Sequence, residues 1–188
     1  EKEVVDQLLE LRNATADRAE KLGAVDRDAL FAAEQNARVV RDAEQYYRTM
    51  VEGGPASWNL RDRHMADMLE ALRAFLGRSG ASPKLVIWAH NSHLGDARWT
   101  EMASLGELNL GQLVRAKYGA DAMLIGFTTY SGTVTAASQW DGPAERKTVR
   151  PALPGSYELL FHSTGLRNLL LMPNEDDPAD EELRLALD

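Results

Sequence analysis

Residues 84–95, KLVIWAHNSHLG, decide the expected fold. The apolar run at 85–88 is rich in strand-forming residues and predicts a strand buried on both faces. The polar residues HNSH at 90–93 follow at the point where such a strand would leave the sheet. Because ligands bind at the carboxyl ends of strands in open parallel sheets, we expect these side chains to face a crevice.

Helical spacing precedes this stretch, and mixed patterns follow it. The expected helices cover residues 2–22, 26–52, 59–77, 109–118 and 156–164, and the expected strands cover 85–88, 122–130, 133–137 and 168–172. Residues 96–108 show no sustained period and predict a loop with a short helical turn at the mouth of the sheet. Helices interleaved with short apolar strands indicate an α/β fold, with layered helices around a mostly parallel sheet.

The predicted organisation has three parts. Residues 1–55 form a long helical segment that acts as a lid or a subdomain, and residues 56–173 form the α/β portion with the site. Residues 174–188 form an acidic helix or tail. Glu1 is not an initiator methionine, and helical spacing begins at once, so we expect a carboxyl-terminal portion of a longer protein.

Composition excludes several classes of protein. The chain has no cysteine, which rules out disulfides and thiolate metal sites. A net charge of -8 without a basic stripe argues against nucleic acid as a partner. Neither a long apolar run nor a signal peptide is present in this sequence, so we expect no membrane partner and a cytoplasmic location.

His90 and His93 are the candidate catalytic residues, because imidazole titrates near neutrality and passes protons in either direction. They are also compatible with two metal ligands, although a catalytic zinc usually needs three, and a histidine after a strand is most often a structural, hydrogen-bonded residue. Asn91 and Ser92 favour tight turns as readily as function. No G-x-S-x-G elbow and no glycine-rich phosphate loop occur.

Arg61 is the third candidate, within the run 59–69, NLRDRHMADML. Asn59 is expected to cap the third helix, with Asp62 reaching back to complete the cap. Most helical arginines are solvated, but one in a water-poor cleft offers a fork of donors to a carbonyl oxygen that gains negative charge.

Four elements together resemble the erythromycin esterase family over roughly residues 55–170. They are R-D-x-x-M-A at 61–66, W-A-H-N-S-H at 88–93, L-G-x-L at 110–113 and I-G-F-T at 125–128. The resemblance implies a hydrolase that opens a macrolide lactone or a related ester with water, without a cofactor or a covalent serine intermediate, and with a role in antibiotic resistance. Arg61, His90 and His93 match family active-site residues, and Asn91 is expected to bind substrate.

Other family residues, a histidine and acidic groups from a G-E-x-x-H-G segment, do not occur here. The resemblance therefore implies that the missing amino-terminal half is a partner and supplies the base, and that the isolated piece is inactive. Met68 and Leu110 depart from the usual family residues and leave the substrate open. A metal-assisted hydrolase and a non-catalytic small-molecule-binding or partner module remain alternatives.

Overall fold

The computed structural model describes residues 24–139 and 141–172. They belong to two compact units, Glu1–Gly126 and Phe127–Asp188. Both helices and strands occur, so the chain has the mixed composition expected of an α/β protein. The expected helix at 2–22 and the acidic segment 174–188 lie outside the described residues, and the three-part division remains a prediction.

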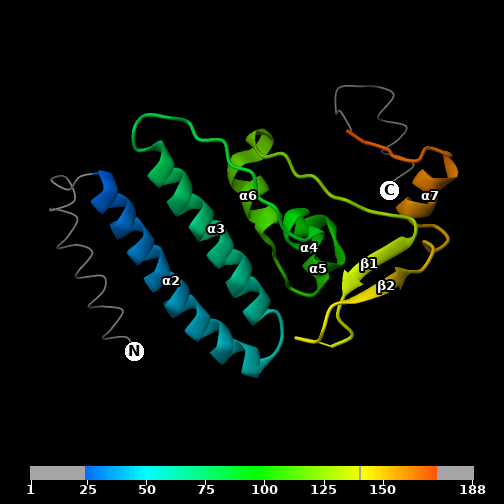
Figure 1. Cartoon of the computed structure of the whole chain (residues 1–188), viewed down its shortest axis with the longest axis horizontal. Coiled ribbons are helices and arrows are strands. Elements are labelled where there is room, and N and C mark those ends of the chain that lie inside the picture. Colours follow the sequence, from blue (N-terminus) through cyan, green and yellow to red (C-terminus); the bar gives the residue numbers. More distant parts are fainter. Residues whose placement is uncertain (1–23, 140, 173–188) are drawn as a thin grey trace. The chain divides into compact units, whose positions relative to one another are not determined.

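A helical hairpin forms much of the first unit. Helix α2 spans Ala24–Glu52 and helix α3 spans Ala56–Gly77, and the two lie side by side in opposite directions (Figure 1). The rings of Phe31 and Phe75 stack at 4.0 Å between their centroids. Gly53 has φ +74°, a conformation that glycine adopts at no steric cost, and α2 ends immediately before it.

A polar pair also joins the two helices. Nδ1 of His64 on α3 lies 2.7 Å from Oδ2 of Asp42 on α2, and Nε of Arg41 donates to Oδ1 of the same carboxylate at 2.6 Å. Burial alone would raise the pKa of Asp42, but the hydrogen bonds from Arg41 and His64 hold that pKa below its ordinary value. The carboxylate is therefore better stabilised in the folded hairpin than in the unfolded chain.

The start of α3 differs from the prediction. The helix begins at Ala56, and the amide of Asn59 already donates to the carbonyl of Pro55 at 2.9 Å. Asn59 is therefore inside the helix, and the prediction that it caps the helix is wrong. Its side chain instead donates to the carbonyl of Gly106 at 2.9 Å and accepts from the amide of Leu108 at 2.8 Å. The turn at Gly54 and Pro55 leads directly into the helix at Ala56, so the side-chain amide of Asn59 is left to bond to a remote loop.

Short helical elements follow the hairpin. They are α4 (Asn91–Leu94), the 3-10 helix η1 (Ala97–Trp99), α5 (Glu101–Ser104), α6 (Leu110–Tyr118) and the 3-10 helix η2 (Gly119–Asp121). The expected loop with a helical turn and the expected helix at 109–118 are both confirmed. Asn109 caps α6 by accepting from the amide of Gln112 at 2.9 Å.

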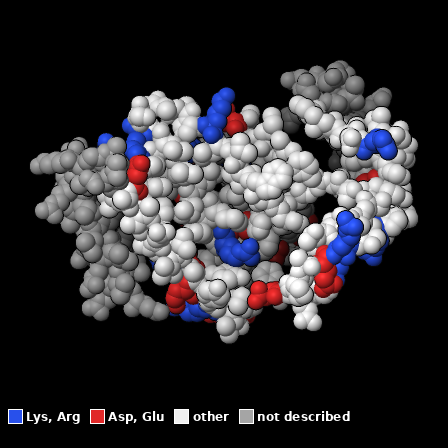
Figure 2. Space-filling model, viewed as in Figure 1, with Lys and Arg blue, Asp and Glu red and all other residues white. Residues whose placement is uncertain are grey.

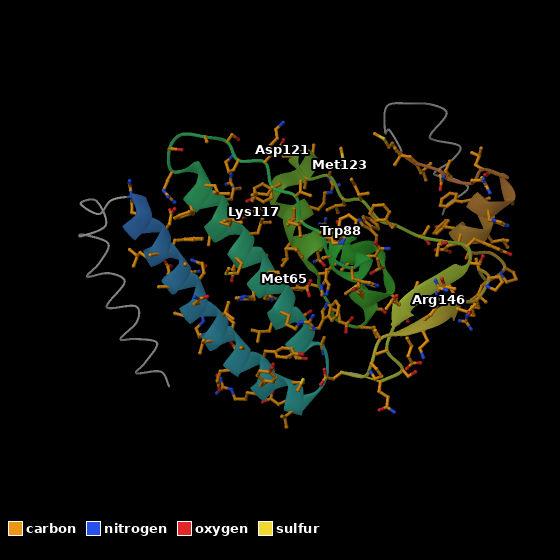
Figure 3. All side chains as sticks on the ribbon, in the orientation of Figure 1. Met65, Trp88, Lys117, Asp121, Met123 and Arg146 are labelled. Carbon is orange, nitrogen blue, oxygen red and sulfur yellow. The ribbon has the colours of Figure 1, made fainter. Side chains whose placement is uncertain are left out.

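Helix α6 packs against two neighbours. At Gly111 a Cβ atom would lie 2.3 Å from the carbonyl oxygens of both Leu94 and Gly95, so this helix and the end of α4 are in backbone contact. Against α3, Nζ of Lys117 lies 2.6 Å from Glu70, and Tyr118 donates to the same carboxylate. Lys117 is labelled on α6 in Figure 3.

The predicted strand at 85–88 is not present in the described structure. Residues 81–90 have neither helical nor strand hydrogen bonding, and Val86 and Trp88 are 94% and 86% exposed. Residues 122–129 likewise form no helix and no ladder, and Met123, which is labelled in Figure 3, is 77% exposed. For the structure as described, the prediction of a strand buried on both faces is therefore wrong. Local sequence favours extended backbone, but a ladder also needs a neighbouring strand to accept its hydrogen bonds.

The second unit contains the one sheet found in the described ranges. Strand β1 (Gly132–Ala136) pairs antiparallel with β2 (Glu145–Val149), and Val134 lies opposite Lys147. The strand expected at 133–137 is confirmed, and it pairs with β2, at 145–149, where no strand was expected. Among these residues no parallel sheet occurs.

A short helix ends the described part of this unit. Helix α7 spans Tyr157–Ser163, with Ser156 as its cap and Gly165 at φ +75° just beyond it, as predicted. Residues 168–172 form no strand. The rings of Tyr130 and His162 stack at 3.7 Å between their centroids.

Charged side chains of both signs are scattered over the face shown in Figure 2. In the part of the chain that the structure describes, no helix is both long enough and apolar enough to cross a membrane.

Candidate functional site

A buried carboxylate lies at the centre of the candidate site. Asp62 on α3 is fully buried, and its Oδ1 accepts a hydrogen bond from the amide of Leu110 at 2.8 Å. Nδ1 of His93 lies 2.9 Å from Oδ1 and 3.1 Å from Oδ2 of the same carboxylate. Asp62 therefore joins α3, α4 and the start of α6. The prediction that it completes the cap of α3 is wrong, because the helix begins at Ala56, about one turn before the position that a cap at Asn59 requires.

Trp58 holds the other side of the His93 ring. The indole and imidazole planes differ by only 5°, with 4.7 Å between their centroids. The Trp58 Nε1–H group donates to the carbonyl of Leu108 at 2.8 Å, which fixes the indole in turn. A stacked plane and a bonded Nδ1 leave the His93 ring little freedom to rotate. Its other nitrogen, Nε2, is the one left for a substrate.

Arg61 lies beside the same indole. Its guanidinium carbon is 5.6 Å from the centre of the Trp58 ring and 5.8 Å from the centre of the Tyr46 ring on α2. Both distances fall within the range of cation–π attraction. The side chain of Arg61 is exposed in the structure as described, as most helical arginines are. Arg61 is accessible to a ligand that approaches Trp58.

His90 caps α4, one turn before His93. Its Nδ1 accepts a hydrogen bond from the amide of Ser92 at 3.2 Å and lies 3.0 Å from the Ser92 hydroxyl oxygen. The amide of His93 donates to the carbonyl of His90 at 2.9 Å. The residue is exposed, and its position relative to His93 is set by this turn.

Asn109 links the turn that contains His90 and His93 to helix α6. It is 1% exposed, and its Nδ2 donates to the carbonyl of Ser92 at 2.9 Å. Its Oδ1 caps α6, so one buried amide links the histidine turn to the helix that also contacts Asp62. Asn91, the expected substrate-binding residue, is the exposed first residue of α4. Its Oδ1 is 4.0 Å from the position that a Cβ atom would take at Gly126.

The structure thus brings Arg61 and His93 to one indole, with His90 one turn away. Sequence reasoning missed the roles of Asp62, Trp58 and Tyr46 in this arrangement. Asp62 occurs in the same R-D-x-x-M-A element as Arg61, but its spacing within a helix favours a cap. Nothing local indicates that its partner is 31 positions away.

A surface hollow elsewhere on α3 and α6 is lined by a different set of residues. They are Arg63, Ala66, Asp67, Leu69, Glu70, Leu113, Val114, Lys117 and Tyr118. None of the four predicted site residues is among them. Across residues 24–139 and 141–172, no three side chains of the metal-binding types gather closely enough to hold an ion.

Comparison with known families gives one match. The model of the family described as erythromycin esterase matches residues 1–188 of the chain. No solved structure matches the chain.

Proposed function

The chain belongs to the erythromycin esterase family, and we propose that it supplies Arg61, His90 and His93 to a site that hydrolyses a carboxylic ester with water. Asn91 is proposed to contact the substrate. A macrolide lactone as substrate, a cytoplasmic location and a role in antibiotic resistance belong to the same proposal.

One observation supports this proposal above the others. Arg61 and His93 lie against the same Trp58 ring, 5.6 Å and 4.7 Å from its centre, although they come from different chain segments. A guanidinium supplies several fixed donors, and an imidazole exchanges protons near neutral pH. Ester hydrolysis needs both kinds of group beside one carbonyl.

The proposed reaction has two steps. The histidine that the family resemblance implies as the base takes a proton from water while the water oxygen bonds to the carbonyl carbon. The carbonyl oxygen becomes an anion stabilised by donors from Arg61, His90 and His93. The bond from carbon to the alcohol oxygen then breaks, and the imidazolium returns its proton to that oxygen. The products are one carboxylic acid and one alcohol.

The test compares two neighbouring arginines in the natural full-length protein. Arg61→Ala removes one donor to the anion and is expected to lower kcat/KM about a hundredfold or more. Arg63→Ala removes an exposed arginine two residues away and is expected to change kcat/KM less than about threefold. Circular dichroism checks that both variants fold. Wild-type turnover by Arg61→Ala would exclude the proposed role.

Two other functions make different predictions. A metal-assisted hydrolase loses activity on chelation and contains metal after purification, whereas the proposed mechanism is unaffected by a chelator. A non-catalytic binding module hydrolyses no ester at all while still binding a small molecule.

We also propose that residues 85–88 and 122–130 join a mostly parallel sheet in the natural full-length protein. In the described structure neither segment is in a helix or a ladder, and Val86 and Met123 are largely exposed. In the full-length protein, amide hydrogen exchange at 85–88 is expected to be slow. Fast exchange there would exclude the sheet.

A further inference from the structure

The guanidinium of Arg61 contacts aromatic rings instead of a carboxylate. Its central carbon lies 5.8 Å from the centre of the Tyr46 ring on α2 and 5.6 Å from the centre of the Trp58 ring on α3. Arg38 and Arg98, in contrast, each donate to a nearby carboxylate. Within residues 24–139 and 141–172, the side chain of Arg61 forms no hydrogen bond and no ion pair. A ring attracts the positive charge without using any of the N–H donors, so these donors remain available to a ligand oxygen.

The hairpin sets Tyr46 opposite Arg61. Asp42 lies one turn before Tyr46 on α2, and its Oδ2 is 2.7 Å from Nδ1 of His64 on α3. His64 lies about one turn after Arg61. Residues three or four positions apart share a helix face, and α2 and α3 run in opposite directions (Figure 1). The bond between Asp42 and His64 therefore places the next ring on α2 against the guanidinium on α3.

We infer that Tyr46 is a positioning residue, whose ring keeps the Arg61 guanidinium beside Trp58. The inference rests on the proposed ester hydrolysis, in which Arg61 donates to the carbonyl oxygen as that oxygen becomes negative. An exposed arginine side chain has many rotamers, and restricting them costs conformational entropy. A second ring, on α2, restricts the guanidinium before substrate binds, so less of this cost is left for the reaction itself. Tyr46 thus brings α2 into the site by acting through Arg61.

Replacing the ring is expected to lower kcat more than it raises KM, because the negative oxygen exists in the transition state and not in the bound ester. A cation–π contact corresponds to roughly two- to thirtyfold in an equilibrium constant. We expect Tyr46→Leu in the full-length protein to lower kcat at least about threefold and to change KM less than about twofold. Tyr46→Phe keeps the ring and is expected to restore kcat to within about twofold of wild type. Erythromycin and p-nitrophenyl acetate are the two ester probes.

Two controls separate positioning from a general effect on the hairpin. Tyr47→Leu makes the same substitution at the next residue, which is 63% exposed, and is expected to change kcat less than about twofold. In an Arg61→Ala background, Tyr46→Leu is expected to lower kcat by less than about a further twofold, because no guanidinium is left to position. A full further loss in that background would assign Tyr46 a merely structural role and overturn the inference. Circular dichroism checks that each variant folds.

Arginine side-chain NMR tests the contact without any turnover. Protons above an aromatic ring resonate upfield, so the Nε–Hε peak of Arg61 is expected upfield of free arginine, and its absence from Arg61→Ala assigns it. In Tyr46→Leu the peak should move toward the position of free arginine, and in Tyr46→Phe it should stay.

The wild-type spectrum keeps the inference falsifiable even where Tyr46→Leu does not fold. A wild-type peak at the position of free arginine overturns the inference, whether or not the protein hydrolyses esters. An upfield peak without hydrolysis of either ester overturns the proposed function instead. A folded Tyr46→Leu whose kcat falls less than threefold, or no more than that of Tyr47→Leu, overturns the positioning role and leaves the proposed function standing.

Discussion

Gly111→Ala tests whether the packing of α6 against α4 holds the site together. The added Cβ atom would lie 2.3 Å from two carbonyl oxygens, those of Leu94 and Gly95, and 2.5 Å from the Leu94 carbonyl carbon. These distances are roughly 1 Å shorter than ordinary van der Waals contact. All three atoms belong to backbone, so no side chain can rotate away, and α6 must shift relative to α4.

The expected cost follows from that shift. Overpacking of this kind costs about 1–3 kcal/mol. A displacement near 1 Å also breaks the hydrogen bond of 2.8 Å from the Leu110 amide to Asp62, and an unsatisfied buried group costs about 1–3 kcal/mol more. Alanine recovers at most about 1 kcal/mol through its better helix propensity. We therefore expect the free energy of unfolding to fall by about 2–4 kcal/mol, which corresponds to a drop in Tm of about 5–15 °C.

Thermal unfolding followed by circular dichroism measures this drop. Gly95→Ala is the matched control, because it changes the other glycine of the same contact. Its Cβ atom would lie 3.8 Å from its nearest neighbour, and its φ of −69° suits alanine. That variant should keep its stability within about 0.5 kcal/mol. A Gly111→Ala protein that melts within about 1 °C of wild type would refute the reasoning.

Two further variants test other contacts. Asn59→Ala removes the hydrogen bonds to Gly106 and Leu108 and should lower the free energy of unfolding by about 1–3 kcal/mol in urea, with an unchanged slope; a midpoint equal to wild type would contradict this. The pKa of Asp42 in the folded protein lies below the ordinary aspartate value of about 3.9. Its contribution to the free energy of unfolding is therefore complete above that ordinary value and is lost as the pH falls through the lower pKa of the folded state. Asp42→Asn should therefore be less stable than wild type at neutral pH, and the difference should shrink in acid; a constant difference across the acid titration would count against the pair with His64 and Arg41.

Local signals predicted the helix ends well. Ser156 and Gly165 bracket α7, and Asn109 and Gly119 bracket α6, because a cap or a left-handed residue acts within a few positions of itself. The same reasoning failed at Asn59 and was incomplete at Asp62. Both side chains have the capping chemistry, but their partners lie 47 to 49 positions away for Asn59 and 31 or 48 positions away for Asp62. No local pattern distinguishes a cap from a distant contact.

The strand at 85–88 failed for a different physical reason. Its residues specify extended backbone, and the backbone of 81–90 is free of helix as expected. A sheet, however, is a property of two or more segments, and Val86 remains 94% exposed. The turn that holds His90 and His93 was easier to predict than the sheet, because it depends on short-range bonds between His90, Ser92 and His93.

Side chains on α3 hydrogen-bond to the carboxyl-terminal end of the loop at 96–108. Trp58 and Asn59 bond to the backbone at 106–108, and Asp62 bonds to the amide of residue 110. The stretch at 98–105, which follows the fully buried Ala97, is thus anchored by bonds that lie beyond its own carboxyl-terminal end. Because long insertions in a surface loop add little closure entropy, this stretch is a natural graft point. Replacing it with longer or shorter segments would vary what surrounds the histidines while leaving their anchors intact.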